Sequence, residues 1–127
     1  VKEGLIFTNL VEFDSKWGHR RDVDGYKKGL ESFDKRLGQL MELINNDDLI
    51  IINADHGCDP TFKGTDHTRE YIPVLIYSKL FNSPVNLGIL NSFADIGATI
   101  GENFGLSPIP VGSSFLSKLE EVCHEHI

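Results

Sequence analysis

The segment from Leu49 to Asp55 constrains the fold of this chain more than any other. It begins with a continuous apolar run, LIII at residues 49–52, which is too short for a typical helix and rich in β-branched side chains. Such a run is typical of a central strand that is covered on both faces. We therefore expect a buried strand here, with the carboxylate of Asp55 just beyond its carboxyl end.

Two further strands and one long helix are predicted around this run. Residues 4–13 are rich in β-branched and aromatic side chains and lead to Asp14, and residues 73–77 (PVLIY) have a similar apolar pattern. Between the first two strands, residues 24–44 carry apolar side chains at spacings of three or four, which is typical of an amphipathic helix. This stripe consists of Tyr26, Leu30, Phe33, Leu37, Leu40, Met41 and Ile44.

The C-terminal part of the chain predicts two shorter helices. Ser92 is placed to cap a helix over residues 93–103, and Gly105 is placed to end it. One of the serines at 113–114 opens a last helix, which is expected to end at about Cys123.

The order of these elements indicates an α/β fold. Strands that alternate with helices form a sandwich around a mostly parallel sheet, because each helix covers a face of that sheet. Ligands of such sheets bind beyond the carboxyl ends of the strands. Asp14 and Asp55, each of which follows a predicted strand, are therefore expected at one edge of the sheet.

The composition excludes several classes of protein. With 127 residues, 40% of them hydrophobic, the chain suits one compact domain and is too small for two substantial ones. Its 19 acidic and 12 basic side chains leave a net charge of −7, so nucleic acid is not an expected partner. No apolar run approaches the roughly 20 residues of a membrane span. Cys58 and Cys123 form no CxxC pair, which favours a reducing compartment, the cytoplasm.

Three of the five histidines lie in short polar loops beside aspartates. His19 follows Asp14 closely, His56 follows Asp55 directly, and His67 lies in the next loop. Carboxylate oxygens and imidazole nitrogens bind divalent metals, and this set suits two ions, for which Mn²⁺, Zn²⁺ and Fe²⁺ all fit. Two ions roughly 3.5–4 Å apart would clamp the attacking and leaving oxygens of a phosphoryl group.

Alternative interpretations of these residues stay open. A lone Asp-His pair is more often a turn with a solvated histidine, but its place after an apolar strand and before Gly57 favours a metal ligand. Asp66 either orients a histidine ring or is simple loop charge. The three loop arginines either bind phosphate through both terminal nitrogens or are solvated. They are Arg20, Arg21 and Arg69.

Three specific motifs stand at residues 13–22 (FDSKWGHRRD), 53–60 (NADHGCDP) and 64–73 (GTDHTREYIP). Together they closely resemble the phosphopentomutase (phosphodeoxyribomutase) family of the alkaline-phosphatase superfamily. The resemblance implies a three-layer α/β/α sandwich of alkaline-phosphatase type. Within it, residues 1–127 form the C-terminal part of the metal-binding catalytic core, and the nucleophile segment and the cap domain lie outside this chain.

The resemblance also implies a set of ligands and an activity. Asp14, His19 and His67 would hold one Mn²⁺ and Asp55 and His56 the other, with Zn²⁺ or another divalent ion as alternatives. A threonine outside this chain would carry the phosphoryl group, so the chain itself holds no catalytic nucleophile. The implied activity is an isomerase reaction that interconverts (deoxy)ribose 1-phosphate and (deoxy)ribose 5-phosphate, activated by a sugar bisphosphate. The missing N-terminal part of the same protein is the expected partner.

Other functions compete with this one. Cofactor-independent phosphoglycerate mutase shares residues 54–57 (ADHG), but its first aspartate and histidine are typically closer together than Asp14 and His19. Its last ligand typically lies further from the Asp-His pair than His67 does from His56. A metal-dependent phosphatase is the other enzyme alternative. The non-enzyme alternative is an isolated metal-binding half domain, and the chain alone is expected to be inactive.

Overall fold

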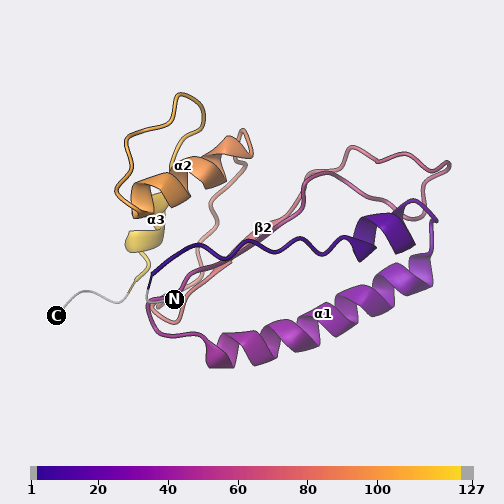
Figure 1. Ribbon diagram of the computed structural model, residues 1–127, viewed down its shortest axis with the longest axis horizontal. Helices are drawn as coiled ribbons and strands as arrows, with labels where there is room; N and C mark the ends of the chain where they lie inside the picture. Colours follow the sequence, from indigo (N-terminus) through magenta and orange to yellow (C-terminus); the bar gives the residue numbers. More distant parts are fainter. Residues whose placement is uncertain (1–2, 124–127) are drawn as a thin grey trace. The chain divides into compact units, whose positions relative to one another are not determined.

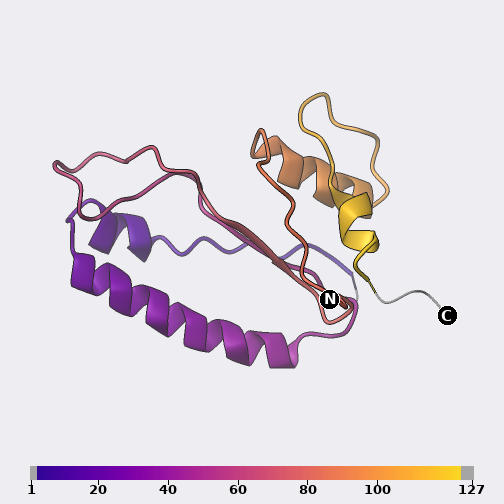
Figure 2. The same cartoon turned by 180° about the vertical axis from the view of Figure 1, so that it is seen from behind.

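The computed structural model describes residues 3–123 of the chain (Figures 1 and 2). The chain divides into two compact units. The first unit comprises the residues up to 44 and residues 50–76, and the second comprises residues 45–49 and those from 77 onward. The elements in chain order are the π-helix η1 (Phe13–Gly18), the helix α1 (Val23–Leu43), the strands β1 (Ile50–Asn53) and β2 (Val74–Tyr77), and the helices α2 (Ala94–Asn103) and α3 (Leu116–Glu120).

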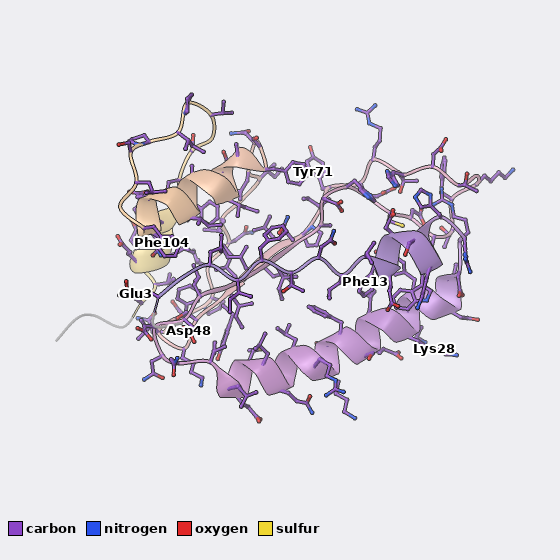
Figure 3. The ribbon with its side chains drawn as sticks, in the orientation of Figure 1. Glu3, Phe13, Lys28, Asp48, Tyr71 and Phe104 are labelled. Atoms are coloured by element: carbon purple, nitrogen blue, oxygen red, sulfur yellow. The ribbon has the colours of Figure 1, made fainter. Side chains whose placement is uncertain are left out.

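The long helix α1 confirms the prediction made from its apolar spacing. It begins after Asp22, whose side-chain Oδ1 accepts a hydrogen bond from the backbone N–H of Gly25 at 2.8 Å. This bond satisfies one of the N–H groups that a helix leaves free in its first turn. Lys28 lies on the exposed side of the helix (Figure 3). The apolar stripe is only partly covered, because Leu30 and Leu40 remain 50% and 46% exposed.

The strands β1 and β2 confirm the predictions at residues 49–52 and 73–77 to within one residue at each end. They pair with each other as a small antiparallel sheet. An isolated antiparallel bridge between Gly57 and Thr68 continues the pairing into the connecting loop. A Cβ atom at Gly57 would lie 2.6 Å from the Thr68 carbonyl oxygen, so only glycine allows this approach.

The sheet departs from the expected one. The described residues combine helices and strands, as an α/β fold does, but their two-stranded sheet is antiparallel, whereas we expected a mostly parallel sheet. A parallel pair needs a crossover of about a dozen or more residues, usually a helix. The loop between β1 and β2 contains no helix and returns the chain in the opposite direction.

The prediction of a strand at residues 4–13 is wrong. Residues 4–10 form an exposed segment without strand pairing, and the π-helix η1 begins at Phe13. Asp14 therefore lies on η1, not at the end of a strand. The β-branched composition indicates an apolar segment, but a strand also needs a pairing partner, and residues 4–10 pair with neither β1 nor β2. Ile6 and Phe7 are each 86% exposed as a result.

Packing of Trp17 against two glycines of α1 holds η1 in place. A Cβ atom at Gly29 would lie 2.4 Å from Trp17 Cζ3, and one at Gly25 would lie 2.5 Å from Trp17 Cδ1. The ring of Phe13, which lies on η1 beside the start of α1 (Figure 3), meets Trp17 and Tyr26 edge-on at centroid distances of 5.1 and 5.4 Å. The glycines thus form the flat helix face on which the indole rests.

The second unit has its core between α2 and α3. Phe115 and Leu119 are 3% and 4% exposed, and Thr99 is 1% exposed. Thr99 Oγ1 donates to the Asp95 carbonyl at 2.7 Å and accepts from the Phe115 N–H at 3.0 Å, so it joins the two helices. Hydrogen bonds from the N–H groups of Ser113, Asn91 and Ser92 lower the pKa of the Asp95 carboxyl against the opposing effect of burial.

The predicted helix at 93–103 is confirmed, and its end has the expected cause. Gly105 has a φ of 68°, and the N–H of Leu106 donates to the Gly101 carbonyl at 2.9 Å, which is a glycine-dependent stop. The last helix is shorter than predicted: it runs from Leu116 to Glu120, and Cys123 forms a bridge with Phe81. No helix within residues 3–123 is both long and apolar enough to cross a membrane.

The glycines of α1 give a paired test of the Trp17 packing. Gly29→Ala is expected to destabilise the chain, because overpacking costs about 1–3 kcal/mol and outweighs a helix-propensity gain of about 1 kcal/mol. Gly38→Ala, where nothing lies within 4 Å of the added Cβ, is the matched control and is expected to stabilise by about 0.5–1 kcal/mol. Urea unfolding followed by circular dichroism measures both. Equal effects of the two substitutions would contradict the packing.

Candidate metal centre

The π-helix η1 brings Asp14 and His19 to the same side of the chain. The N–H of His19 donates to the Asp14 carbonyl at 3.0 Å, an i to i+5 hydrogen bond. In an α-helix, a spacing of five residues would turn the second side chain about 140° away from the first. The wider π turn removes most of that rotation. His19 Nε2 consequently lies 3.4 Å from Asp14 Oδ2.

His67 completes a group of three donors from a distant part of the sequence. Its Nε2 lies 3.0 Å from Asp14 Oδ1. One ligand atom from each of Asp14, His19 and His67 lies within 4.8 Å of the other two. A metal ion bonded to nitrogen and oxygen at about 2.0–2.2 Å fits among atoms spaced in this way. One carboxylate and two imidazoles are also a chemically suitable set for Mn²⁺, Fe²⁺ or Zn²⁺.

His56 and Asp55 form a second pair of donors beside the first group. The His56 ring stacks on the His67 ring, with centroids 3.7 Å apart and an angle of 15° between the planes. His56 Nε2 lies 3.5 Å from Asp14 Oδ1 and 3.6 Å from Asp55 Oδ1. The Asp55 side chain is 84% exposed, so its carboxylate can turn toward a ligand. The structure therefore places all five predicted ligand residues in one region of the first unit.

Backbone carbonyls orient two of the imidazole rings. His19 Nδ1 lies 2.5 Å from the Thr65 carbonyl oxygen, and His56 Nδ1 lies 2.9 Å from the Gly57 carbonyl oxygen. A carbonyl oxygen only accepts hydrogen bonds, so each Nδ1 carries the proton and donates it. In the neutral ring, Nε2 is then the atom with the lone pair that a metal requires, and both Nε2 atoms point toward Asp14.

Sequence comparisons assign the chain to a family. The family described as the Metalloenzyme superfamily matches residues 1–108. The chain belongs to the Metalloenzyme superfamily. Membership agrees with a group of Asp and His side chains that can hold a metal ion.

Three similar curated relatives are phosphopentomutases. The chain is 55% identical to the one from Clostridium novyi (strain NT) over 118 residues, which is 93% of this chain and 30% of the relative. It is 56% identical over 119 residues to the one from Caldanaerobacter subterraneus subsp. tengcongensis, covering 94% of this chain and 30% of the relative. It is 57% identical over 117 residues to the one from Clostridioides difficile (strain 630), covering 92% of this chain and 30% of the relative. The chain thus spans about a third of these relatives.

In this member of the superfamily, the loop between β1 and β2 is organised by its own polar side chains. Asp59 Oδ1 accepts hydrogen bonds from the N–H and the hydroxyl of Thr61, which lower the pKa of the Asp59 carboxyl. Thr68 Oγ1 accepts from the Asp59 N–H and donates to Glu70, at 2.6 Å in each case. His67 therefore lies in a loop whose conformation is held by these hydrogen bonds.

The structure answers the question that the sequence left open for Arg21. Its guanidinium binds backbone carbonyls of the same loop, those of Asp59, Gly64 and Asp66. It is therefore not simply solvated, and each of its three nitrogens is already bound to a main-chain oxygen. The sequence offered no signal for this role, because carbonyl acceptors leave no pattern of side chains. Arg20 and Arg69 are exposed.

Cys58 lies near the donors but differs from them chemically. Burial raises the pKa of its thiol, and the carboxylate of Asp14 adds to this effect while Arg21 opposes it. A protonated thiol is a poor metal ligand compared with a neutral imidazole. The Asp and His side chains are therefore the better donors at neutral pH.

The effect of His67 on metal affinity tests the convergence of the donors. His67→Ala is expected to weaken Mn²⁺ binding by more than about 100-fold, which exceeds the loss typical of residues that only support a ligand. Asp66→Asn, which changes the neighbouring exposed side chain, is the matched control and is expected to leave the affinity within a few-fold of the original. Isothermal titration calorimetry measures both. Unchanged affinity in His67→Ala would contradict the assignment.

Proposed function

We propose that these residues form the metal-binding part of a phosphopentomutase, an isomerase that interconverts (deoxy)ribose 1-phosphate and (deoxy)ribose 5-phosphate. One observation carries the proposal: Asp14, His19 and His67 converge in a chain that is 55–57% identical to phosphopentomutases. The chain spans about 30% of those relatives, so the proposal concerns the whole protein to which these residues belong.

The proposed centre holds two divalent ions, Mn²⁺ in the first instance. Asp14, His19 and His67 bind one ion, and Asp55 and His56 contribute to the second. When bound, the ions neutralise the charge that develops on a transferring phosphoryl group. The position of Asp55 supports this division, because its carboxylate lies 3.6 Å from His56 Nε2 and is 84% exposed, outside the group formed by Asp14, His19 and His67.

The chain's own residues orient the proposed ligand atoms. In the neutral form of each ring, His19 and His56 present the Nε2 lone pair to an ion, because the Nδ1–H group is bound to a backbone carbonyl. The Asp14 carboxylate is the shared neighbour of these atoms, because its oxygens lie within 3.5 Å of the Nε2 atoms of His19, His56 and His67. These contacts fix the ligand atoms before an ion or a substrate arrives, which lowers the reorganisation needed during the reaction.

We further propose that the rest of the catalytic machinery lies in the part of the protein that the relatives have beyond this match. This part includes the threonine that carries the phosphoryl group, a further ligand of the second ion, and the cap domain that binds the sugar. It also completes a three-layer sandwich around a mostly parallel sheet. The exposed apolar side chains of Leu5, Ile6 and Phe7 support this, because such a segment is stable when other strands cover it. The enzyme acts in the cytoplasm and is primed by a sugar bisphosphate.

Conversion of deoxyribose 1-phosphate by the full-length protein tests the function. Phosphorus NMR separates the 1-phosphate, the 5-phosphate and free phosphate in one experiment. We expect the 5-phosphate to form with Mn²⁺ present, and His67→Ala to reduce the rate by about 100-fold or more, as loss of a metal ligand implies. Asp66→Asn serves as the control with near-normal rate.

Two outcomes would contradict this proposal. Release of free phosphate without the 5-phosphate would identify a phosphatase, and conversion of phosphoglycerate instead of pentose phosphate would identify the other mutase. The 127-residue chain alone is expected to be inactive. Measurable conversion by that chain would show that the nucleophile does not lie elsewhere.

A further inference from the structure

Arg21 makes an unusual set of contacts for a loop arginine. Its Nε donates to the Gly64 carbonyl at 2.6 Å, Nη1 donates to the Asp59 carbonyl at 2.9 Å, and Nη2 donates to the Asp66 carbonyl. All three acceptors are backbone oxygens of the loop that leads to His67. The guanidinium is therefore satisfied by main-chain groups that have no charge of their own.

The backbone of Arg21 is in an unfavourable conformation. Its φ of 52° lies in the left-handed region, and among residues 3–123 it is the only residue other than glycine with a positive φ. A side chain with a Cβ atom is disfavoured there, whereas glycine is not. Such a conformation persists when its surroundings hold it. Here the three side-chain hydrogen bonds contribute, together with the backbone bonds of Arg21 to Gly18 and Val23.

The carbonyls that bind Arg21 lie next to the backbone groups that orient His19 and His67. The carbonyls of Gly64 and Asp66 lie on either side of Thr65, whose own carbonyl accepts from His19 Nδ1. The Asp66 carbonyl also belongs to the peptide bond that enters His67. One guanidinium thus holds the backbone that orients His19 and the backbone that delivers His67.

We propose that Arg21 is a positioning residue for the metal centre. It holds residues 59–66 against the turn after η1 so that His19 and His67 meet at Asp14 before a metal binds. The inference rests on the proposed metal centre and goes beyond it, because it assigns to Arg21 control of metal affinity without contact with the ion. Lysine cannot replace it, since an ammonium group lacks the rigid planar fork that reaches three carbonyls together.

The sign of the effect distinguishes positioning from simple electrostatics. A positive charge near the site repels a divalent cation, so its removal would by itself strengthen metal binding. Loss of the three hydrogen bonds would instead release the loop and weaken binding. Arg20, the neighbouring exposed arginine, reports the electrostatic effect alone.

The experiment compares Arg21→Gly, Arg21→Lys and Arg20→Gly in the full-length protein that contains this chain. Co²⁺ is titrated into each protein, and the visible absorption of the bound ion gives both the affinity and the ligand geometry. Glycine suits the positive φ, so Arg21→Gly removes the guanidinium while relieving the backbone. Circular dichroism and thermal melting without metal establish that each variant is folded.

Arg21→Gly is expected to weaken Co²⁺ binding by about 10–100-fold, the range typical of residues that orient ligands, and to change the absorption spectrum. Arg21→Lys is expected to recover at most part of this loss, and added ethylguanidinium to restore the spectrum of Arg21→Gly. Arg20→Gly is expected to bind as tightly as the unmodified protein or slightly more tightly.

The outcomes distinguish the role of Arg21 from the existence of the metal centre. If the unmodified protein binds Co²⁺ and Arg21→Gly binds it equally well or better with the same spectrum, the role of Arg21 is wrong and the metal centre stands. If the unmodified protein binds no Co²⁺, the metal centre is wrong and the role of Arg21 falls with it. If Arg21→Gly does not fold, Arg21→Lys decides. Full Co²⁺ affinity and an unchanged absorption spectrum in Arg21→Lys would contradict the positioning role of Arg21.

Discussion

The backbone hydrogen bond from the His19 N–H to the Asp14 carbonyl determines the geometry of the candidate site. It closes a π turn, which brings two residues five positions apart closer to the same side than an α-helical turn does. The turn is held from outside by Trp17, which packs on Gly25 and Gly29 of α1. The long helix therefore has a direct role in the site, although it contributes none of the proposed ligands.

The remaining ligands come from one loop that returns to this turn. Asp14 and His67 are 53 residues apart, so their approach depends on contacts that close a long segment of chain. Pairing of β1 with β2 and the bridge between Gly57 and Thr68 bring the two sides of the loop together. Arg21 then binds the loop to the turn through three carbonyls.

Much of the local structure could be predicted because side-chain patterns record it. The apolar spacing of α1 and the short apolar run of β1 indicated their elements, and the Asp and His residues indicated metal chemistry. Side-chain patterns indicate less clearly which strands pair. The composition of residues 4–13 predicts a strand, but β1 and β2 pair without them. The π turn and the contacts of Arg21 use backbone groups, which are the same in every residue and leave no pattern in the sequence.

Anomalous X-ray scattering from crystals grown with Mn²⁺ tests most directly whether two ions bind between these side chains. We predict one peak within bonding distance of Asp14, His19 and His67, and a second beside Asp55 and His56. Bonding distance for these nitrogen and oxygen ligands is about 2.0–2.3 Å. A manganese peak elsewhere, or none at the three residues that converge, would contradict the account.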